Sequence, residues 1–150
     1  MNGMLKSFAL VLLALLCVAG TAIAGGGSGE TDGGGEEEQI TIAYTGYPGG
    51  LSAFWAQMAQ YMGEEAAAMG VEFLDMSPTS ADAAMQKDAV DNAINRGVDG
   101  IIIGAVDNRA FGESLDRAAA RGIPAVAVDT AIDHPHISAL AQTDNLASAR

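Results

Sequence analysis

Cysteine, aromatic residues and positive charge are all scarce in this chain of 150 residues. The single cysteine excludes an internal disulfide framework and any zinc site built from four cysteines. Only 7 basic residues accompany 19 acidic ones, and the net charge of −12 disfavours binding to nucleic-acid phosphates or anionic membranes. With 4 prolines and 19 glycines, the composition is neither collagen-like nor proline-rich disorder. Apolar residues make up 49% of the chain, enough for one core but not two.

Residues 1–24 have the three-part layout of a secretory signal peptide. Lys6 gives the start its positive charge, residues 8–19 form an uncharged stretch of twelve, and residues 22–24 (Ala-Ile-Ala) follow the small–x–small cleavage pattern. The stretch is too short for a stable membrane anchor. We therefore expect cleavage after Ala24 and export to the periplasm or the cell exterior, with a buried N-terminal helix or an anchor as the alternatives.

Residues 25–39 contain seven glycines and five acidic residues and no apolar side chain, so they are predicted to form a flexible linker. Such a linker also resembles the tether of a lipoprotein, which makes Cys17 a candidate for lipidation. However, Leu16 is too large for the position before a lipoprotein cleavage site. Cleavage after Ala24 is therefore favoured, and a lipid anchor at Cys17 is the alternative.

From residue 39 onward the pattern becomes regular. Short β-rich runs begin near residues 40, 71, 100 and 125, at intervals of 31, 29 and 25 residues, and each interval holds a helical pattern. This spacing is typical of βαβ units, since parallel strands need a crossover that is long enough for a helix. Residues 101–103 and 125–128 are continuously apolar, as in strands covered on both faces. The sequence thus predicts an α/β lobe over residues 40–150, with a doubly wound, mostly parallel sheet and flanking helices.

Three helices are predicted between these strands, over residues 52–69, 79–96 and 109–121. The first has one apolar face at three- and four-residue spacing, made of Trp55, Met58, Met62, Ala66 and Met69. Thr79 and Asp82 have the spacing of a capping box at the start of the second. A fifth strand is expected over residues 138–142. About eight residues join it to the fourth strand, too few for a helical crossover, so its direction stays open.

Ligands of open doubly wound sheets bind beyond the carboxyl ends of the strands. The residues expected there supply carboxylates, amides, hydroxyls and aromatic rings: Tyr44 to Tyr47, Asp75, Gly104 to Asp107, Asp129 with Thr130, and Thr143 to Asn145. They include no cluster of cations for a phosphate. The glycines after the first strand lack the dinucleotide-binding spacing, and neither a Walker lysine nor a nucleophilic serine elbow is present. A nucleotide-dependent enzyme or a serine hydrolase is therefore disfavoured.

No cofactor and no metal are predicted. The two histidines of residues 133–136 (Asp-His-Pro-His) are interpreted as part of a surface loop, because the proline between them fixes a poor geometry for metal ligation.

Four segments together resemble a known family. They are the first strand with Phe54-Trp55 opening its helix, residues 96–103 (RGVDGIII), residues 122–129 (GIPAVAVD) and residues 143–145 (TDN). Their order and spacing over residues 39–150 are similar to the N-terminal lobe of type I periplasmic sugar-binding proteins of the ribose/galactose type. The same fold occurs in the effector domains of lactose-repressor-like regulators. The resemblance implies non-enzymatic capture of a sugar and its delivery to an ABC permease, with the ligand enclosed between this lobe and a second one of similar size.

The resemblance also implies roles for single residues. Phe54 and Trp55 would stack on the apolar face of a sugar, and Asp129 would accept hydrogen bonds from its hydroxyls. Three departures from the family pattern lie at this site: Thr130 replaces a common arginine, Gly104 replaces a common asparagine, and Pro48-Gly49-Gly50 replace an asparagine–proline pair. They leave the identity of the sugar open.

The predicted ligand-binding residues are Asp129, Phe54, Trp55, Tyr47, Asp107 and Asn145. A carboxylate and an aromatic plate suit a sugar, which has hydroxyls at its rim and C–H groups on its faces. Each residue also has a structural alternative. The rings of Phe54 and Trp55 can pack in the core, Asp107 and Asn145 can cap helices, and Tyr47 and Asp129 can be surface residues.

Two alternatives to transport remain open. One is a ligand-presenting protein for a chemoreceptor or sensor kinase, and the other is an exported α/β enzyme. A regulator is disfavoured because no helix-turn-helix precedes the first strand. We expect a monomer without nucleic-acid partners.

Overall fold

The computed structural model describes residues 39–143. The predicted signal peptide, Cys17, the linker up to residue 38, and Asn145 lie outside the described residues.

Five strands form one sheet whose order is β2-β1-β3-β4-β5, and all four pairings are parallel. The strands are β1 (Thr41–Thr45), β2 (Glu72–Asp75), β3 (Gly100–Ile103), β4 (Ala125–Val128) and β5 (Ile137–Ala141). Each lies close to a predicted strand. The predicted α/β class, with a parallel sheet and flanking helices, is confirmed. From β1 the chain first moves to one side of the sheet and then to the other, so the topological switch point lies between the carboxyl ends of β1 and β3.

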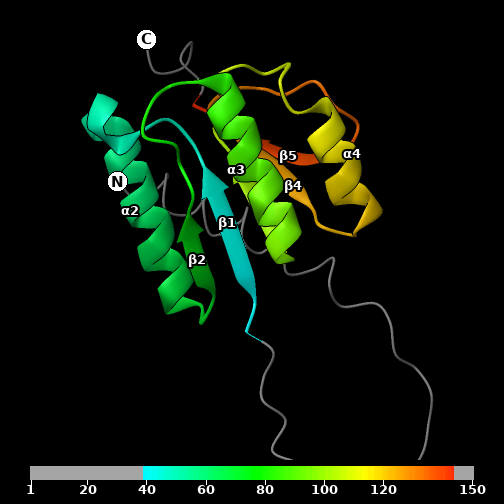
Figure 1. The fold of residues 1–150 in the computed structure, drawn as a ribbon. Coiled ribbons are helices and arrows are strands. Elements are labelled where there is room, and N and C mark those ends of the chain that lie inside the picture. Colours follow the sequence, from blue (N-terminus) through cyan, green and yellow to red (C-terminus); the bar gives the residue numbers. More distant parts are fainter. Residues whose placement is uncertain (1–38, 144–150) are drawn as a thin grey trace, which may run out of the picture.

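The connections contain a short 3₁₀ helix η1 (Gly49–Leu51) and the helices α2 (Ala53–Ala68), α3 (Ala83–Arg96) and α4 (Gly112–Ala120). Buried residues of α2 pack with one face of the sheet, which includes Ile102 and Val126. Buried residues of α3 and α4 pack with the opposite face, which includes Ile101 and Ile103. The helices therefore cover both faces of the sheet, as Figure 1 shows. All residues of β3 and β4 are buried, as their continuous apolar runs predict.

The predicted capping box at the start of the second helix is wrong. The N-cap of α3 is Asp82 itself, whose carboxylate accepts a hydrogen bond from the backbone N–H of Met85 at 2.9 Å. The helix therefore begins after Asp82 and not at Thr79, because the carboxylate satisfies a free N–H of the first turn.

The first and third helices also differ from their predicted bounds. Met69 is 36% exposed at the end of α2, so it does not belong to the buried face. The third helix begins at Gly112 rather than Arg109, because Asp107 organises a turn before it. In this turn the side chain of Asp107 accepts from Arg109 N at 2.9 Å, and its carbonyl accepts from Ala110 N at 3.2 Å.

The direction of β5 is parallel to β4, although only residues 129–136 connect the two strands. An extended chain advances about 3.3 Å per residue, so eight residues can return along a four-residue strand without a helix. The return runs over the face that α4 covers, since Ile132 packs into the same core cluster as Leu115 of α4. Between residues 39 and 143, no helix has the length and apolar character needed to cross a membrane.

Candidate functional site

A buried glutamine joins the ends of β1 and β3 at the switch point. Gln86 on α3 is fully buried, and its Nε2 donates to the carbonyl oxygens of Gly104 (2.8 Å) and Thr45 (3.3 Å). Its Oε1 accepts from the backbone N–H of Val106 at 2.8 Å. These three contacts hold the two loops that leave β1 and β3, which carry Tyr47 and Asp107 of the predicted site.

The sequence analysis did not single out Gln86, although a signal was present. Gln86 shares the apolar face of α3 with Val90, Ala93 and Ile94, at spacings of four, seven and eight residues, and all four side chains are buried. A polar residue at a core position of an amphipathic helix is expected to satisfy buried backbone groups.

Three predicted site residues form one aromatic cluster. The rings of Tyr47 and Trp55 stack with centroids 4.7 Å apart and an interplanar angle of 22°. Phe54 meets Trp55 edge-on, with centroids 5.0 Å apart, and remains 43% exposed. Trp55 also packs against the core beneath α2, so its structural alternative is partly correct. Since Tyr47 covers one face of Trp55, the cluster offers a ligand its outer surface at Phe54 and Tyr47.

Gly104 explains why Trp55 reaches the end of the sheet. A Cβ added at Gly104 would lie 3.2 Å from Cζ3 of Trp55 and 3.4 Å from Cγ2 of Val128. These separations are tight, so a larger side chain such as asparagine would displace the indole ring. The departure from the family pattern at Gly104 thus accompanies an indole ring that packs in the same cluster as Val128, the last residue of β4.

Asp129 occupies an unusual backbone conformation directly after β4. Its φ of 63° is the one positive value among the non-glycine residues of the described part of the chain. Thr130 N donates to Val128 O at 2.7 Å, which closes a three-residue γ-turn around Asp129, and Asp129 N donates to Ala141 O of β5 at 2.8 Å. Such strain costs on the order of 1–3 kcal/mol and concentrates at functional sites. The turn leaves the side chain of Asp129 exposed at the carboxyl edge.

The other carboxylates at this edge serve their own loops. One oxygen of Asp107 accepts from Arg109 N, so the side chain stabilises the turn before α4 and does not cap the helix. Asp75 accepts from Ser77 N at 3.0 Å in the same manner, and the Ser77 hydroxyl accepts from Gly46 N at 3.0 Å. Both carboxylates are exposed, so each keeps a free oxygen toward solvent.

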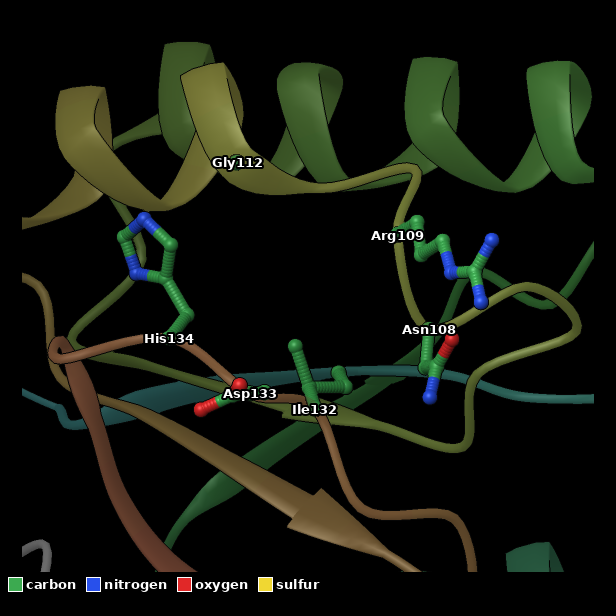
Figure 2. A pocket seen from close by; sticks show the side chains of 6 residues that line it. All are labelled: Asn108, Arg109, Gly112, Ile132, Asp133 and His134. Carbon is green, nitrogen blue, oxygen red and sulfur yellow. The ribbon is translucent and has the colours of Figure 1, made fainter.

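A separate pocket of about 480 Å³ lies on the α4 side of the same edge. Figure 2 shows it between the turn that enters α4 and the crossover from β4 to β5, lined by Asn108, Arg109, Gly112, Ile132, Asp133 and His134. None of the predicted site residues lines it. We place the candidate site on the side of this edge that carries the aromatic cluster and the exposed Asp129 instead.

The chemistry of the site suits a neutral, hydroxyl-rich ligand. The carboxylates of Asp75 and Asp129 can accept hydrogen bonds from hydroxyl groups, and the aromatic rings offer an apolar surface to C–H groups. The region supplies acceptors rather than the cations that a phosphate needs. Within residues 39–143, no group of three histidine, cysteine or acidic side chains is arranged to hold a metal ion. His134 and His136 instead both lie near Asp116 of α4, at 3.5 and 3.7 Å.

Comparisons with known proteins identify relatives of this chain. The chain is 30% identical over 122 residues to a xylitol-binding protein of Mycolicibacterium smegmatis, a match that covers 81% of this chain and 34% of that protein. It resembles the structure of an ABC transporter solute-binding protein from Mycobacterium smegmatis with bound glycerol, with a TM-score of 0.62 and 25% identity over 68% of this chain and 34% of the other. It also resembles a solute-binding protein from Bacillus halodurans with bound myo-inositol, with a TM-score of 0.57 and 29% identity over 66% of this chain and 34% of the other.

The chain therefore spans about a third of the length of these relatives, all of which are described as binding proteins. The family model of the periplasmic binding protein domain matches residues 42–150, which include the whole described sheet. On this match, together with the parallel sheet and its order, the chain belongs to the periplasmic binding protein family.

Proposed function

We propose that this chain is the N-terminal lobe of a protein that captures a sugar or polyol outside the cytoplasmic membrane and delivers it to an ABC permease. The observation that carries the proposal is the aromatic cluster of Tyr47, Phe54 and Trp55 at the carboxyl edge of the sheet, the edge at which Asp129 is also exposed. Asp129 accepts hydrogen bonds from ligand hydroxyls, and the outer rings of the cluster contact the ligand's C–H groups. Asp107, in the loop after β3, and Asn145, which lies outside the described residues, complete the proposed set.

The ligand class is a neutral polyol or monosaccharide. The relatives named above bind xylitol, glycerol and myo-inositol according to their descriptions, and all three ligands are rich in hydroxyls and carry no charge. The carboxylates at the edge of this sheet would repel an anionic ligand. The oxygens of these carboxylates can instead accept hydrogen bonds from the many hydroxyl groups of a polyol.

The ligand is enclosed between this lobe and a second lobe of similar size. Support comes from the exposure of the proposed contacts, since Phe54 is 43% exposed and Asp129 is also exposed. Ligand pockets commonly bury ~70–90% of the ligand surface, and one open wall cannot do so. Closure of two lobes about a hinge supplies the second wall and excludes the water that competes for each hydroxyl.

The test uses the complete gene product in a thermal-shift screen against pentoses, hexoses, linear polyols, inositols and non-sugar solutes. A ligand that binds only the folded state raises the melting temperature, and isothermal titration then gives its affinity. Asp129→Asn is the informative variant. Asparagine tolerates a positive φ and keeps the shape of the side chain, but it removes the charge. We expect affinity to fall roughly 10- to 100-fold, from the loss of about 1.5–3 kcal/mol.

Asp88→Asn, at an exposed position of α3, is the matched control and should leave affinity unchanged. No stabilisation by any sugar or polyol, combined with stabilisation by a charged solute, would contradict the proposed ligand class. Unchanged affinity in Asp129→Asn would remove Asp129 from the site.

A further inference from the structure

Gly104, which directly follows β3, is buried against the indole ring of Trp55. Its φ is not positive, in contrast to that of Gly70, Gly97 and Gly122, so the backbone itself does not require glycine. A Cβ added here would lie 3.2 Å from Cζ3 of Trp55, which is tighter than an ordinary van der Waals contact. The absence of a side chain therefore serves to leave space for the indole ring.

The backbone of Gly104 is held from both sides and cannot retreat from this ring. Its carbonyl oxygen accepts from Nε2 of Gln86 at 2.8 Å, and its N–H donates to the carbonyl oxygen of Thr45 at 2.9 Å. A methyl group at position 104 would also lie 3.4 Å from Cγ2 of the buried Val128 and 3.5 Å from Cα of Gly46. To admit a larger side chain, the indole ring must therefore be the group that moves.

Trp55 supports the two rings that a ligand can reach. Tyr47 stacks on the indole ring, and Phe54 meets it edge-on. The indole ring also packs against the core cluster that includes Met58 and Val128, and a close-packed core does not yield to it. A displaced indole ring thus moves away from the sheet and shifts the other two rings with it. The residue at position 104 consequently sets where the aromatic surface of the candidate site lies.

An aromatic surface in a fixed position distinguishes between hydroxyl-rich ligands of different shape. A sugar or inositol ring gathers C–H groups on its faces and hydroxyl groups at its rim, so one face can lie flat on aromatic side chains. An open-chain polyol carries a hydroxyl group on every carbon and directs these groups to both sides of the chain, so it has no continuous C–H face. Glycine adds no polar side chain to this surface, which therefore stays apolar.

We propose that Gly104 is a specificity-determining residue, which selects a ring-shaped sugar or cyclic polyol over an open-chain polyol by leaving Trp55 room against the sheet. This inference rests on the proposed function and narrows its ligand class. A C–H face of the ring lies on Phe54 and Tyr47, and the support of Trp55 holds these two side chains in place. An open-chain ligand gains less from this surface and depends more on its hydrogen bonds.

The experiment compares Gly104→Ala with Gly112→Ala in the complete gene product. Gly112 also lacks a positive φ, but a Cβ added there would meet open space, so its variant is the matched control. The probes are two pairs with equal numbers of carbons, D-glucose with sorbitol and D-xylose with xylitol, each titrated by calorimetry. The unmodified protein should bind the ring more tightly than its open-chain partner.

In Gly104→Ala we expect this preference for the ring to shrink by about 2- to 10-fold, because the contact with the aromatic surface is disturbed. Gly112→Ala should leave the preference unchanged. A merely structural effect of Gly104→Ala would weaken both members of a pair by the same factor, and this result would overturn the inference. Tighter binding of the open-chain partner by the unmodified protein would also overturn it and leave the proposed function intact. Binding of no sugar or polyol at all would contradict the proposed function itself.

A double-mutant cycle with Trp55→Phe tests whether the added methyl group acts through the indole ring. Phenylalanine is smaller, so it leaves room for a methyl group at position 104. Once Trp55 is phenylalanine, Gly104→Ala should reduce the preference for the ring little further. Full additivity of the two changes would show that the methyl group acts by another route, and the proposed role of Gly104 would have to be abandoned.

Discussion

Gln86 offers the sharpest test of how this lobe holds its site together. Replacement by leucine keeps the volume and the apolar character of the core but removes all three hydrogen bonds. The Thr45 carbonyl keeps a partner, because it also accepts from Gly104 N at 2.9 Å. The Gly104 carbonyl and the Val106 N–H lose theirs. Each buried group without a partner costs about 1–3 kcal/mol, so the loss of two should lower the free energy of unfolding of Gln86→Leu by about 2–6 kcal/mol.

Urea unfolding, followed by circular dichroism, measures this loss. The midpoint should fall while the slope stays the same, because the substitution changes stability and not the surface exposed on unfolding. The matched control is Gln60→Leu on α2, which removes only an exposed hydrogen bond to Glu64. That bond is worth about 0.2–0.5 kcal/mol. A loss in Gln86→Leu no larger than in the control would refute the role of Gln86 as the link between β1 and β3.

Three further predictions concern other parts of the chain. Burial acts to raise the pKa of Asp91, but hydrogen bonds from Ser114 and Lys87 and the charge of Arg117 outweigh it, and the net pKa lies below the ordinary 3.8. Its ionised form therefore stabilises the fold above that pH and loses this effect as the pH falls through the lower folded value. Asp91→Asn should accordingly flatten the acid limb of a stability-against-pH curve, and an unaltered limb would contradict this. Gly46→Ala should destabilise the protein markedly and lower its melting temperature, because the new methyl group meets the Tyr44 ring, whereas Gly50→Ala has open space and should be tolerated. Intact-mass analysis of the exported protein should show an unmodified N-terminus at Gly25, and a lipidated N-terminus at Cys17 would show the alternative processing.

The sequence alone determined the class of fold and the edge of the sheet at which the site is proposed. Apolar periodicity and the glycines that end helices depend on neighbours within a few residues, so they predicted the strands, the three helices and a mostly parallel sheet covered on both faces. Because parallel strands all end at the same edge of a sheet, the topology also predicts which loops lie together at that edge. The predicted starts of α3 and α4 were wrong because a side chain there accepts a hydrogen bond from a backbone N–H. Asp82 does so at the start of α3, and Asp107 does so in the turn before α4.

Only the tertiary structure decided how the site is built. Gln86 bonds to groups 18, 20 and 41 residues away along the chain, and no local pattern reports such contacts. The direction of β5 depended on whether eight residues could return over α4 without a helix, and Ile132 shows that they do, by packing into the core. The γ-turn at Asp129, the space that Gly104 leaves for Trp55, and the Tyr44 hydroxyl beneath Gly46 likewise arise where distant segments meet. These features depend on close packing between segments that are distant in the sequence. A sequence pattern shows only whether a face of a helix or strand is mostly apolar or mostly polar.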